Sequence, residues 1–251
     1  MFKEEIGNEF IVIQEGASEG TQIKYRKDGF WYKKDNRGHE GRAEYLVSKF
    51  MDFTSLKASE YVTYEEGTIN GSSGCRSRNF LTGEEELITF YRLYYNEVGK
   101  DLSKVIGNMD TMEERIEYVV SFIQESCGLD IQEYLSKIFT LDMICLNEDR
   151  HLNNLAIIMN GDEFTPAPIF DNGIALLTAN QSVNRHFSIA DNVKRVVARP
   201  FSGSHEKMME YFGKGFSVDV NAALEWLDTE PHSMERDVLK YQIERYKDIL
   251  K

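Results

Sequence analysis

Residues 147–154 read Asn147-Glu148-Asp149-Arg150-His151-Leu152-Asn153-Asn154, and residues 170–173 read Phe170-Asp171-Asn172-Gly173. Two short apolar runs lie between these stretches, joined by Asn160-Gly161, which is a strong signal for a two-residue hairpin turn. The acid Asp149 is thus followed by the amide Asn154, and the pattern predicts a hairpin that leads from there to a second acid, Asp171.

A long helix is expected just before this segment. Asp130-Ile131-Gln132-Glu133 has the form of a capping box. Apolar residues then recur at helical spacing as far as Cys145, so the helix should end before Asn147. The apolar runs at 155–159 and 164–170 should form the hairpin, and Pro166 and Pro168 indicate that the second run is an edge strand or no strand.

Asp149, Asn154 and Asp171 should then converge on one cleft, and phosphoryl transfer needs this order of groups. In kinases one acid orients the attacking hydroxyl, while an amide and a second acid hold the magnesium ions that bridge the ATP phosphates. An acid followed five residues later by an amide also recurs by chance. The alternative is that Asp149 and Asp171 are an ordinary helix cap and an ordinary turn residue.

The same residues carry a resemblance to a known family. Asn147-x-Asp149-x-His151-x-x-Asn154 resembles the catalytic loop of the HipA-like serine/threonine kinases, and Asp171 stands where these kinases carry a metal-binding acid. Asp149-Arg150-His151 also resembles the loop of the related phosphatidylinositol kinases. Near the start, Gly20-x-Gln22-x-Lys24 resembles the G-x-Q-x-K loop of the HipA-like kinases. The resemblance implies an α+β, two-lobed protein-kinase-like fold that binds ATP and Mg²⁺.

Residues 1–80 are expected to form the small β-rich lobe. Apolar runs at 9–15, 21–27 and 30–34 alternate with glycine-containing turns, which is typical of an antiparallel meander. A glycine-rich first turn lets backbone N–H groups approach phosphates. By the resemblance, the nucleotide would be bound here by Gly16, Ser18, Gly20 and Gln22. An ordinary hairpin is the alternative.

Lys33 stands at the end of the third run, where the resemblance implies the lysine that pairs with the ATP phosphates. Lys34 should point to the opposite face, and Lys33 shares its face with Trp31, so Lys33 is expected on the buried side. The amphipathic helix that follows carries Glu40 and Glu44, and a kinase needs one glutamate there to fix the lysine. Glu44 fits the family pattern better. Solvated side chains are the alternative for each residue.

The polar, glycine-rich residues 71–79 are expected to connect the lobes, and residues 81–251 to form the larger, mostly helical lobe. Helices are expected at 87–95, from the capping box Thr111-Met112-Glu113-Glu114 onward, and near the C-terminus at 222–227 and 238–250.

The composition of the 251-residue chain limits its partners. A formal net charge of −13 argues against a nucleic-acid surface and against a polybasic contact with a membrane. No apolar run approaches the length of a membrane span, and the start does not resemble a signal peptide. Three cysteines without metal-type spacing favour reduced thiols, so a cytoplasmic protein is expected.

Two further residues have expected roles. His151, two residues after Asp149, is either a proton shuttle or, as in the resembling kinases, a support of the loop. Many HipA-like kinases silence themselves by phosphorylating a serine just before the glycine of their G-x-Q-x-K loop. Glu19 takes that place here, so Ser18 is the displaced candidate for such a switch.

The sequence thus predicts a kinase that transfers the γ-phosphoryl group of ATP to a serine or threonine hydroxyl of a protein. Asp149 would orient the hydroxyl, Asn154 and Asp171 would hold Mg²⁺, and Lys33, fixed by Glu44, would bind the ATP phosphates. The family also suggests a cognate antitoxin as a partner. Two alternatives stay open: a kinase of a small molecule or lipid headgroup, and a nucleotide-binding pseudokinase that acts as an interaction module.

Overall fold

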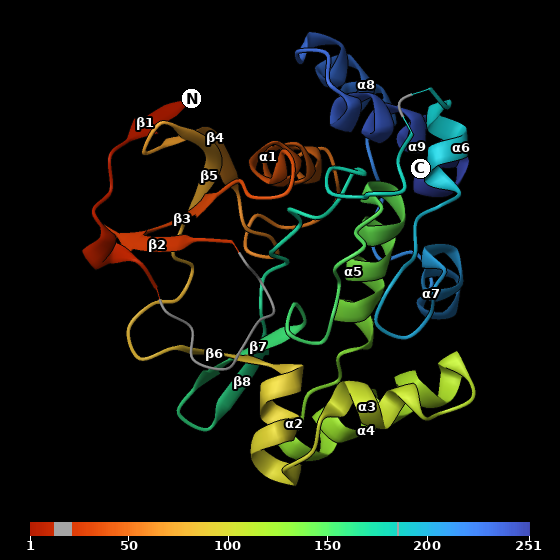
Figure 1. The fold of residues 1–251 in the computed structure, drawn as a ribbon. Helices are drawn as coiled ribbons and strands as arrows, with labels where there is room; N and C mark the ends of the chain where they lie inside the picture. The colour runs from red at the N-terminus through yellow and green to blue at the C-terminus, as the bar shows by residue number, and fades with distance from the viewer. Residues whose placement is uncertain (13–21, 185) are drawn as a thin grey trace.

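Two β-sheets organise the protein, which the computed structural model describes at residues 1–12, 22–184 and 186–251. In Figure 1 the larger sheet lies to the left and most of the helices lie to the right. The larger sheet has the strand order β1-β4-β5-β3-β2, with β1 (Phe2–Glu4), β2 (Lys24–Lys27), β3 (Phe30–Lys34), β4 (Tyr64–Ile69) and β5 (Ser72–Arg78). The smaller sheet has the order β6-β7-β8, with β6 (Glu86–Thr89), β7 (Ala156–Asn160) and β8 (Glu163–Pro166).

Strand β5 corrects the prediction that residues 71–79 connect the lobes. It pairs with both β3 and β4 and is the middle strand of the larger sheet. Its glycine is needed because other backbone lies against it: a Cβ on Gly74 would stand 2.3 Å from the carbonyl oxygen of Lys33. A Cβ on Gly41, in helix α1 (Glu40–Met51), would stand 2.5 Å from the backbone of Gly74. The two sheets are connected by residues 79–85 instead, and the predicted lobe boundary at residue 80 falls in this segment.

The strands predicted in the small lobe have different outcomes. The one at 30–34 is confirmed as β3, and the one at 21–27 is represented by β2. The strand at 9–15 is wrong where the structure describes it, because Asn8–Phe10 is a 3₁₀-helix (η1) and Ile11 makes a single bridge to Tyr25. Phe10 packs against the apolar cluster around Tyr25, so tertiary packing overrides the β-propensity of this run.

The chain enters the larger lobe as a strand, although a helix was predicted at 87–95. Glu86–Thr89 pairs with β7, and helix α2 (Phe90–Val98) begins only after Thr89, whose hydroxyl accepts a hydrogen bond from the Arg92 amide. The strand and the helix form one apolar stretch of sequence. Periodicity alone cannot divide a short run of this kind.

The helix before Asn147 and the hairpin after Asn154 have the predicted form. Helix α5 (Gln132–Cys145) ends before Asn147, and β7 and β8 pair as a hairpin through Asn160 and Glu163. The capping box predicted for α5 is wrong: Ile131 is the N-cap residue, and Asp130 accepts a hydrogen bond from the Gln132 amide. Ile131 is fully buried, so packing determines where this helix begins.

The larger lobe is built around α5, most of whose residues are buried. The capping box at Thr111 is confirmed at the start of α4 (Met112–Cys127), and the helices predicted at 222–227 and 238–250 lie within α8 (Val220–Thr229) and α9 (Met234–Leu250). The remaining helices are α3 (Leu102–Gly107), α6 (Ile189–Val193) and α7 (His205–Phe212). In the parts of the chain that the structure describes, no helix combines the length and the apolar character that a membrane span requires.

Helix α1 belongs to both lobes. Its second half contributes buried side chains to the same apolar core as α5 and α9, and the helix also lies against β4 and β5 of the larger sheet. Figure 1 shows α1 between the larger sheet and the long helices of the second lobe. A charged residue on α1 therefore stands where the two lobes meet.

Candidate active site

Three charged side chains from separate parts of the chain lie in contact: Lys33, Glu44 and Asp171. The ammonium of Lys33, on β3, donates to Glu44 Oε1, on α1, at 2.6 Å and to Asp171 Oδ1 at 2.8 Å. Lys33 and Glu44 are buried, while the Asp171 side chain keeps 26% of its surface exposed. The structure thus brings together the predicted phosphate-binding lysine, its predicted glutamate and the predicted metal-binding acid.

Charge balance in this cluster favours an ionised Lys33 and Asp171. Burial lowers the pKa of Lys33, but the carboxylates of Asp171 and Glu44 outweigh it and hold that pKa well above its ordinary value. Burial raises the pKa of Asp171, and the ammonium groups of Lys33 and Lys24 more than reverse this, so that pKa lies below its ordinary value. The pKa of Glu44 is raised, chiefly by burial.

Of the two glutamates on α1, Glu44 contacts Lys33 and Glu40 does not. Glu44 reaches Lys33, and its second oxygen accepts a hydrogen bond from the Asn172 amide at 2.9 Å. Glu40, one turn earlier, does not point to the lysine. Its carboxylate accepts hydrogen bonds from the backbone amides of the loop that precedes α1, those of Asn36, Arg37 and Gly38.

Asp149 and Asn154 lie in the loop after α5 and are held by short local bonds. The Asp149 amide donates to Asn147 Oδ1 at 3.0 Å, and Asn154 Nδ2 donates to the Asp149 carbonyl at 2.9 Å. The Asn154 nitrogen is therefore engaged, and among the described residues no hydrogen bond reaches its Oδ1. The Asp149 side chain is 43% exposed, so a substrate could reach it.

His151 supports this loop through its backbone, and its ring lies beside Asp149. The His151 amide donates to the Asp149 carbonyl at 2.7 Å, and Nε2 is 3.8 Å from Asp149 Oδ2, too far for a hydrogen bond. The pKa of Asp149 is raised by burial, although the nearby charges of His151 and Arg199 oppose this shift. A raised carboxylate pKa makes Asp149 a better proton acceptor.

Arg150 is a structural residue that the sequence reasoning did not single out. Its guanidinium is fully buried and donates to Asp142 on α5 at 2.9 Å and to Asn172 Oδ1 at 2.6 Å. It also donates to the carbonyls of Phe170 and Asn154 at 2.9 and 3.3 Å. Arg150 thus joins α5, the loop and the segment around Asp171. The available sequence signal was Asp142, an acid inside the apolar run of α5.

Lys24 is a second residue that was missed. It lies opposite Lys33 in the β2–β3 register, and its ammonium is 3.7 Å from Asp171 Oδ2. The signal was present, because Lys24 closes the Gly20-x-Gln22-x-Lys24 motif. Gln22 lies just before β2 and is half-buried. The predicted nucleotide-binding residues Gly16, Ser18 and Gly20 lie outside the described residues.

These side chains fit a magnesium nucleotide. Mg²⁺ in such sites takes one or two protein oxygens and completes its shell with phosphates and waters. Asp171 offers an ionised carboxylate, Asn154 offers Oδ1, and Lys33 and Lys24 offer positive charge for phosphates. Within the described residues there is no group of three or more His, Cys, Asp and Glu side chains that could hold a metal.

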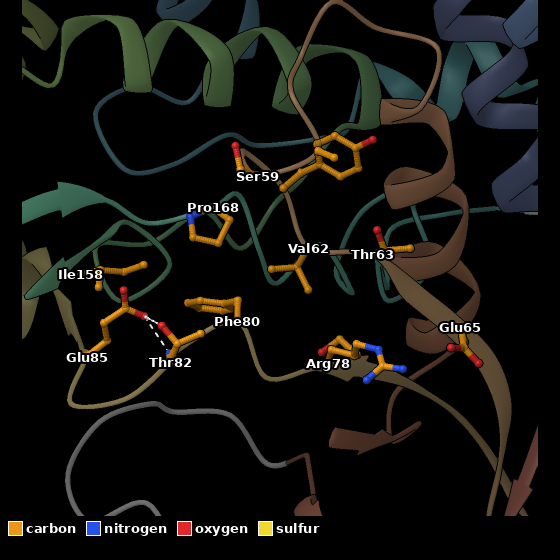
Figure 2. Close-up of a pocket in the computed structure, with 13 residues that line it drawn as sticks. Ser59, Val62, Thr63, Glu65, Arg78, Phe80, Thr82, Glu85, Ile158 and Pro168 are labelled. Atoms are coloured by element: carbon orange, nitrogen blue, oxygen red, sulfur yellow. Dashed lines mark hydrogen bonds between the residues drawn. The ribbon is translucent and has the colours of Figure 1, made fainter. Parts of the chain in front are cut away.

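A cavity lies beside the connection between the two sheets. It has a volume of about 490 Å³ and is enclosed by the segment after α1, the start of β4 and the connection 79–85. Figure 2 shows Val62, Phe80, Ile158 and Pro168 around it. None of the predicted site residues lines this cavity, although its lining residue Phe80 packs on Phe170, the neighbour of Asp171.

The five-stranded sheet, which is antiparallel except for the parallel pair of β1 and β4, lies with helix α1 against a larger helical lobe. This arrangement defines a two-lobed protein-kinase-like fold. The chain is similar to the crystal structure of CtkA, a proinflammatory kinase of Helicobacter pylori, with a TM-score of 0.59 and 15% identity over 98% of this chain and 92% of that one. It is also similar to a structure from Shewanella oneidensis MR-1 of the toxin–antitoxin system HipA, HipB and its operator DNA, with a TM-score of 0.49 and 10% identity over 93% of this chain and 63% of that one.

The similarity to CtkA confirms the predicted α+β, two-lobed kinase-like fold. The resemblance that the short motifs indicated is thus found again at the level of the fold. No family model and no curated protein matches the sequence. At this level of identity the comparison concerns the fold, and the chemistry has to be argued from the residues.

Proposed function

We propose that this protein is an ATP- and magnesium-dependent kinase that phosphorylates a serine or threonine hydroxyl of a protein. The observation that carries the proposal is the meeting of Lys33 with Glu44 and Asp171 at 2.6 and 2.8 Å. In kinases, a lysine fixed by a helix glutamate and a metal-binding acid are the groups that must both be in place around the phosphates.

Each group of the cluster has a task in this reaction. Lys33 pairs with the phosphates, and Glu44 holds its ammonium in position from α1. Lys24 adds a second positive charge beside Asp171. Asp171 and Asn154 Oδ1 are the groups that would hold Mg²⁺, which, when bound, neutralises the charge that develops on the phosphates.

Asp149 acts on the acceptor. Its partly exposed carboxylate orients the hydroxyl and accepts its proton, and the raised pKa of this acid favours that step. The Asn147 side chain accepts a hydrogen bond from the Asp149 amide. Arg150 holds the end of the loop by donating to the Asn154 carbonyl. His151 positions the loop through its backbone, which supports the structural rather than the proton-shuttle interpretation of this residue.

The alternatives differ in how well they fit. A pseudokinase would lack one of the acting groups, whereas Lys33, Glu44, Asp149, Asn154 and Asp171 are all present. A kinase for a small molecule or a lipid headgroup stays open, because Asp149-Arg150-His151 resembles both families. A cognate antitoxin and a cytoplasmic location remain predictions.

The test is phosphoryl transfer from γ-labelled ATP with magnesium to protein and peptide acceptors, followed by identification of the phosphorylated amino acid. Asp149→Asn keeps the shape of the side chain but cannot accept the proton, so transfer should fall by about 10²–10⁴-fold. Asp162→Asn, an exposed acid at the turn of the neighbouring hairpin, is the matched control and should leave the rate unchanged. An undiminished rate in Asp149→Asn would make the assignment of the loop wrong.

A further inference from the structure

A small pocket lies beside the candidate catalytic loop, between this loop and helix α3. Its volume is about 180 Å³, and it is lined by Ser103, Ile106, Gly107, Arg115, His151, Leu152, Arg199 and Pro200. Pockets that hold whole drug-sized ligands have volumes of about 300–1,000 Å³. This one is suited to a single side chain of a larger substrate.

The pocket is cationic although the protein is acidic. Two of its lining residues are arginines and none is an acid, whereas the whole chain has a net charge of −13. Arg115 is already engaged with the carbonyls of Met109 and Phe201. Arg199 is exposed, and within the described parts of the chain its guanidinium makes no hydrogen bond and no salt bridge. Arg199 is therefore available to a ligand.

The pocket adjoins the group that orients the acceptor. His151 lines the pocket, and its Nε2 is 3.8 Å from Asp149 Oδ2. The other ring nitrogen of His151, Nδ1, is buried and has no hydrogen-bond partner among the described residues. The charge of Arg199 is also felt at Asp149, where it opposes the effect of burial on the pKa of that acid. A side chain in the pocket would thus lie next to the hydroxyl held by Asp149.

We propose that this pocket binds an acidic side chain next to the acceptor serine or threonine, and that Arg199 sets this preference. The proposal rests on the proposed function. Arginine recognises a carboxylate through charge-assisted, often bidentate hydrogen bonds, and it has no acceptor for a neutral amide's N–H groups. Ile106, Leu152 and Pro200 offer apolar contact for the methylene stem of such a side chain.

Paired peptides test this preference. Each pair carries one serine acceptor and differs only by Glu or Gln at a single neighbouring position, and the measured quantity is the ratio of the two kcat/KM values. For the wild-type protein, the Glu peptide should be preferred about tenfold at the best position, since a tenfold ratio corresponds to about 1.4 kcal/mol and a charge-assisted hydrogen bond is of that order. In Arg199→Gln the ratio should fall to about one.

Arg195→Gln is the matched control. Arg195 is an exposed arginine four residues earlier, and its guanidinium lies over Phe187 and donates to the Ser182 carbonyl. This variant should keep the wild-type preference for the Glu peptide. A ratio of about one in the wild type, or an unchanged preference in Arg199→Gln, would overturn the proposal.

Two further arms separate the possible failures. A carboxylate could also come from a small hydroxy acid, so free serine is tested as an acceptor; preferred phosphorylation of free serine over every peptide would overturn the peptide source. Transfer to Glu and Gln peptides at equal rates would remove the pocket's role and leave the kinase assignment intact. No transfer to any acceptor, with no effect of ATP and magnesium on the unfolding temperature, would instead reject the proposed function.

Discussion

Two ionic clusters lie close together in this protein, and they differ in their access to solvent. The pair of Arg150 and Asp142 has no exposed surface, and each guanidinium nitrogen donates to a protein group. Lys33 is also buried, but its partner Asp171 keeps 26% of its side chain exposed. A sealed cluster can only hold the backbone in place, whereas an open one can exchange its partners for a ligand.

Asn172 connects the two clusters. Its side-chain oxygen accepts a hydrogen bond from Arg150 at 2.6 Å, and its backbone amide donates to Glu44 at 2.9 Å. The position of Glu44, and with it that of Lys33, thus depends on the buried arginine. The comparison predicts that changes in the sealed cluster act on folding and that changes in the open cluster act on the reaction.

The largest effect on stability is expected for Arg150→Met. The substitution leaves Asp142 buried without its partner, and breaking a buried ion pair in this way costs about 3–5 kcal/mol of unfolding free energy. Urea denaturation measures it. Arg245→Met removes an exposed pair with Glu206 and should cost about 1 kcal/mol or less. Equal losses in the two variants would contradict the distinction between a sealed and an exposed pair.

Lys33→Met should act on the reaction more than on the fold. Phosphoryl transfer should fall by about 10²–10³-fold, as on removal of one preorganised electrostatic group. The loss of stability should stay below that of Arg150→Met, because Glu44 keeps its hydrogen bond from the Asn172 amide, Asp171 borders solvent and Lys24 still lies 3.7 Å from Asp171. Lys34→Met, on the opposite face of the strand, is the control. Comparable losses of rate in both variants would sink the assignment of Lys33.

A smaller effect is expected in the first turn of α1. There the guanidinium of Arg42 lies 2.9 Å from the carboxylate of Glu66 and 2.9 Å from that of Glu230. Arg42→Gln removes a partly exposed pair and should lower the unfolding free energy by about 1 kcal/mol. Because α1 carries Glu44, the rate of transfer should fall as well. Lys49→Gln removes the exposed pair with Asp52 on the same helix and should change neither quantity. A rate that is insensitive to Arg42 would show that this anchor does not position Glu44.

The smallest expected effect is on acid stability. The pKa of Asp171 is depressed in the folded state by Lys33 and Lys24 against burial, so its contribution to stability is present above the ordinary carboxylate pKa of about 3.9 and is lost as the pH falls towards the folded value. Lys33→Met should flatten this part of the curve. Unfolding free energies from about pH 6 to about pH 2 measure the slope. Parallel curves for the two proteins would mean that Lys33 does not set this pKa.

Local patterns were sufficient where the deciding contacts are close in sequence. The loop from Asn147 to Asn154, the hairpin turn and the cap at Thr111 all rest on bonds between near neighbours. Strand alternation predicted that Lys33 lies on the buried side, whereas the role of Lys33 and the choice of Glu44 over Glu40 came from the family pattern.

Other features depend on contacts that no local pattern reveals. Residues 71–79, including Gly74, were predicted as a connector. The glycine is needed because β3 and α1 lie against it, and both come from distant parts of the chain. From the sequence alone an arginine such as Arg150 is expected at the surface. Its burial depends on Asp142 and Asn172, which the fold brings to it. Lys24 was recognised as part of a motif, but its approach to Asp171 depends on how β2 lies over the segment after β8.

The most direct test of the open cluster is the effect of magnesium on nucleotide-dependent stability. ATP with magnesium should raise the unfolding temperature of the wild-type protein, and a ligand at a hundredfold excess over its Kd adds about 2.7 kcal/mol to the unfolding free energy. In Asp171→Ala most of the magnesium-dependent part of this increase should disappear, while Asp162→Ala should retain it. An unchanged magnesium effect in Asp171→Ala would contradict the assignment of Asp171 and, with it, the nucleotide site.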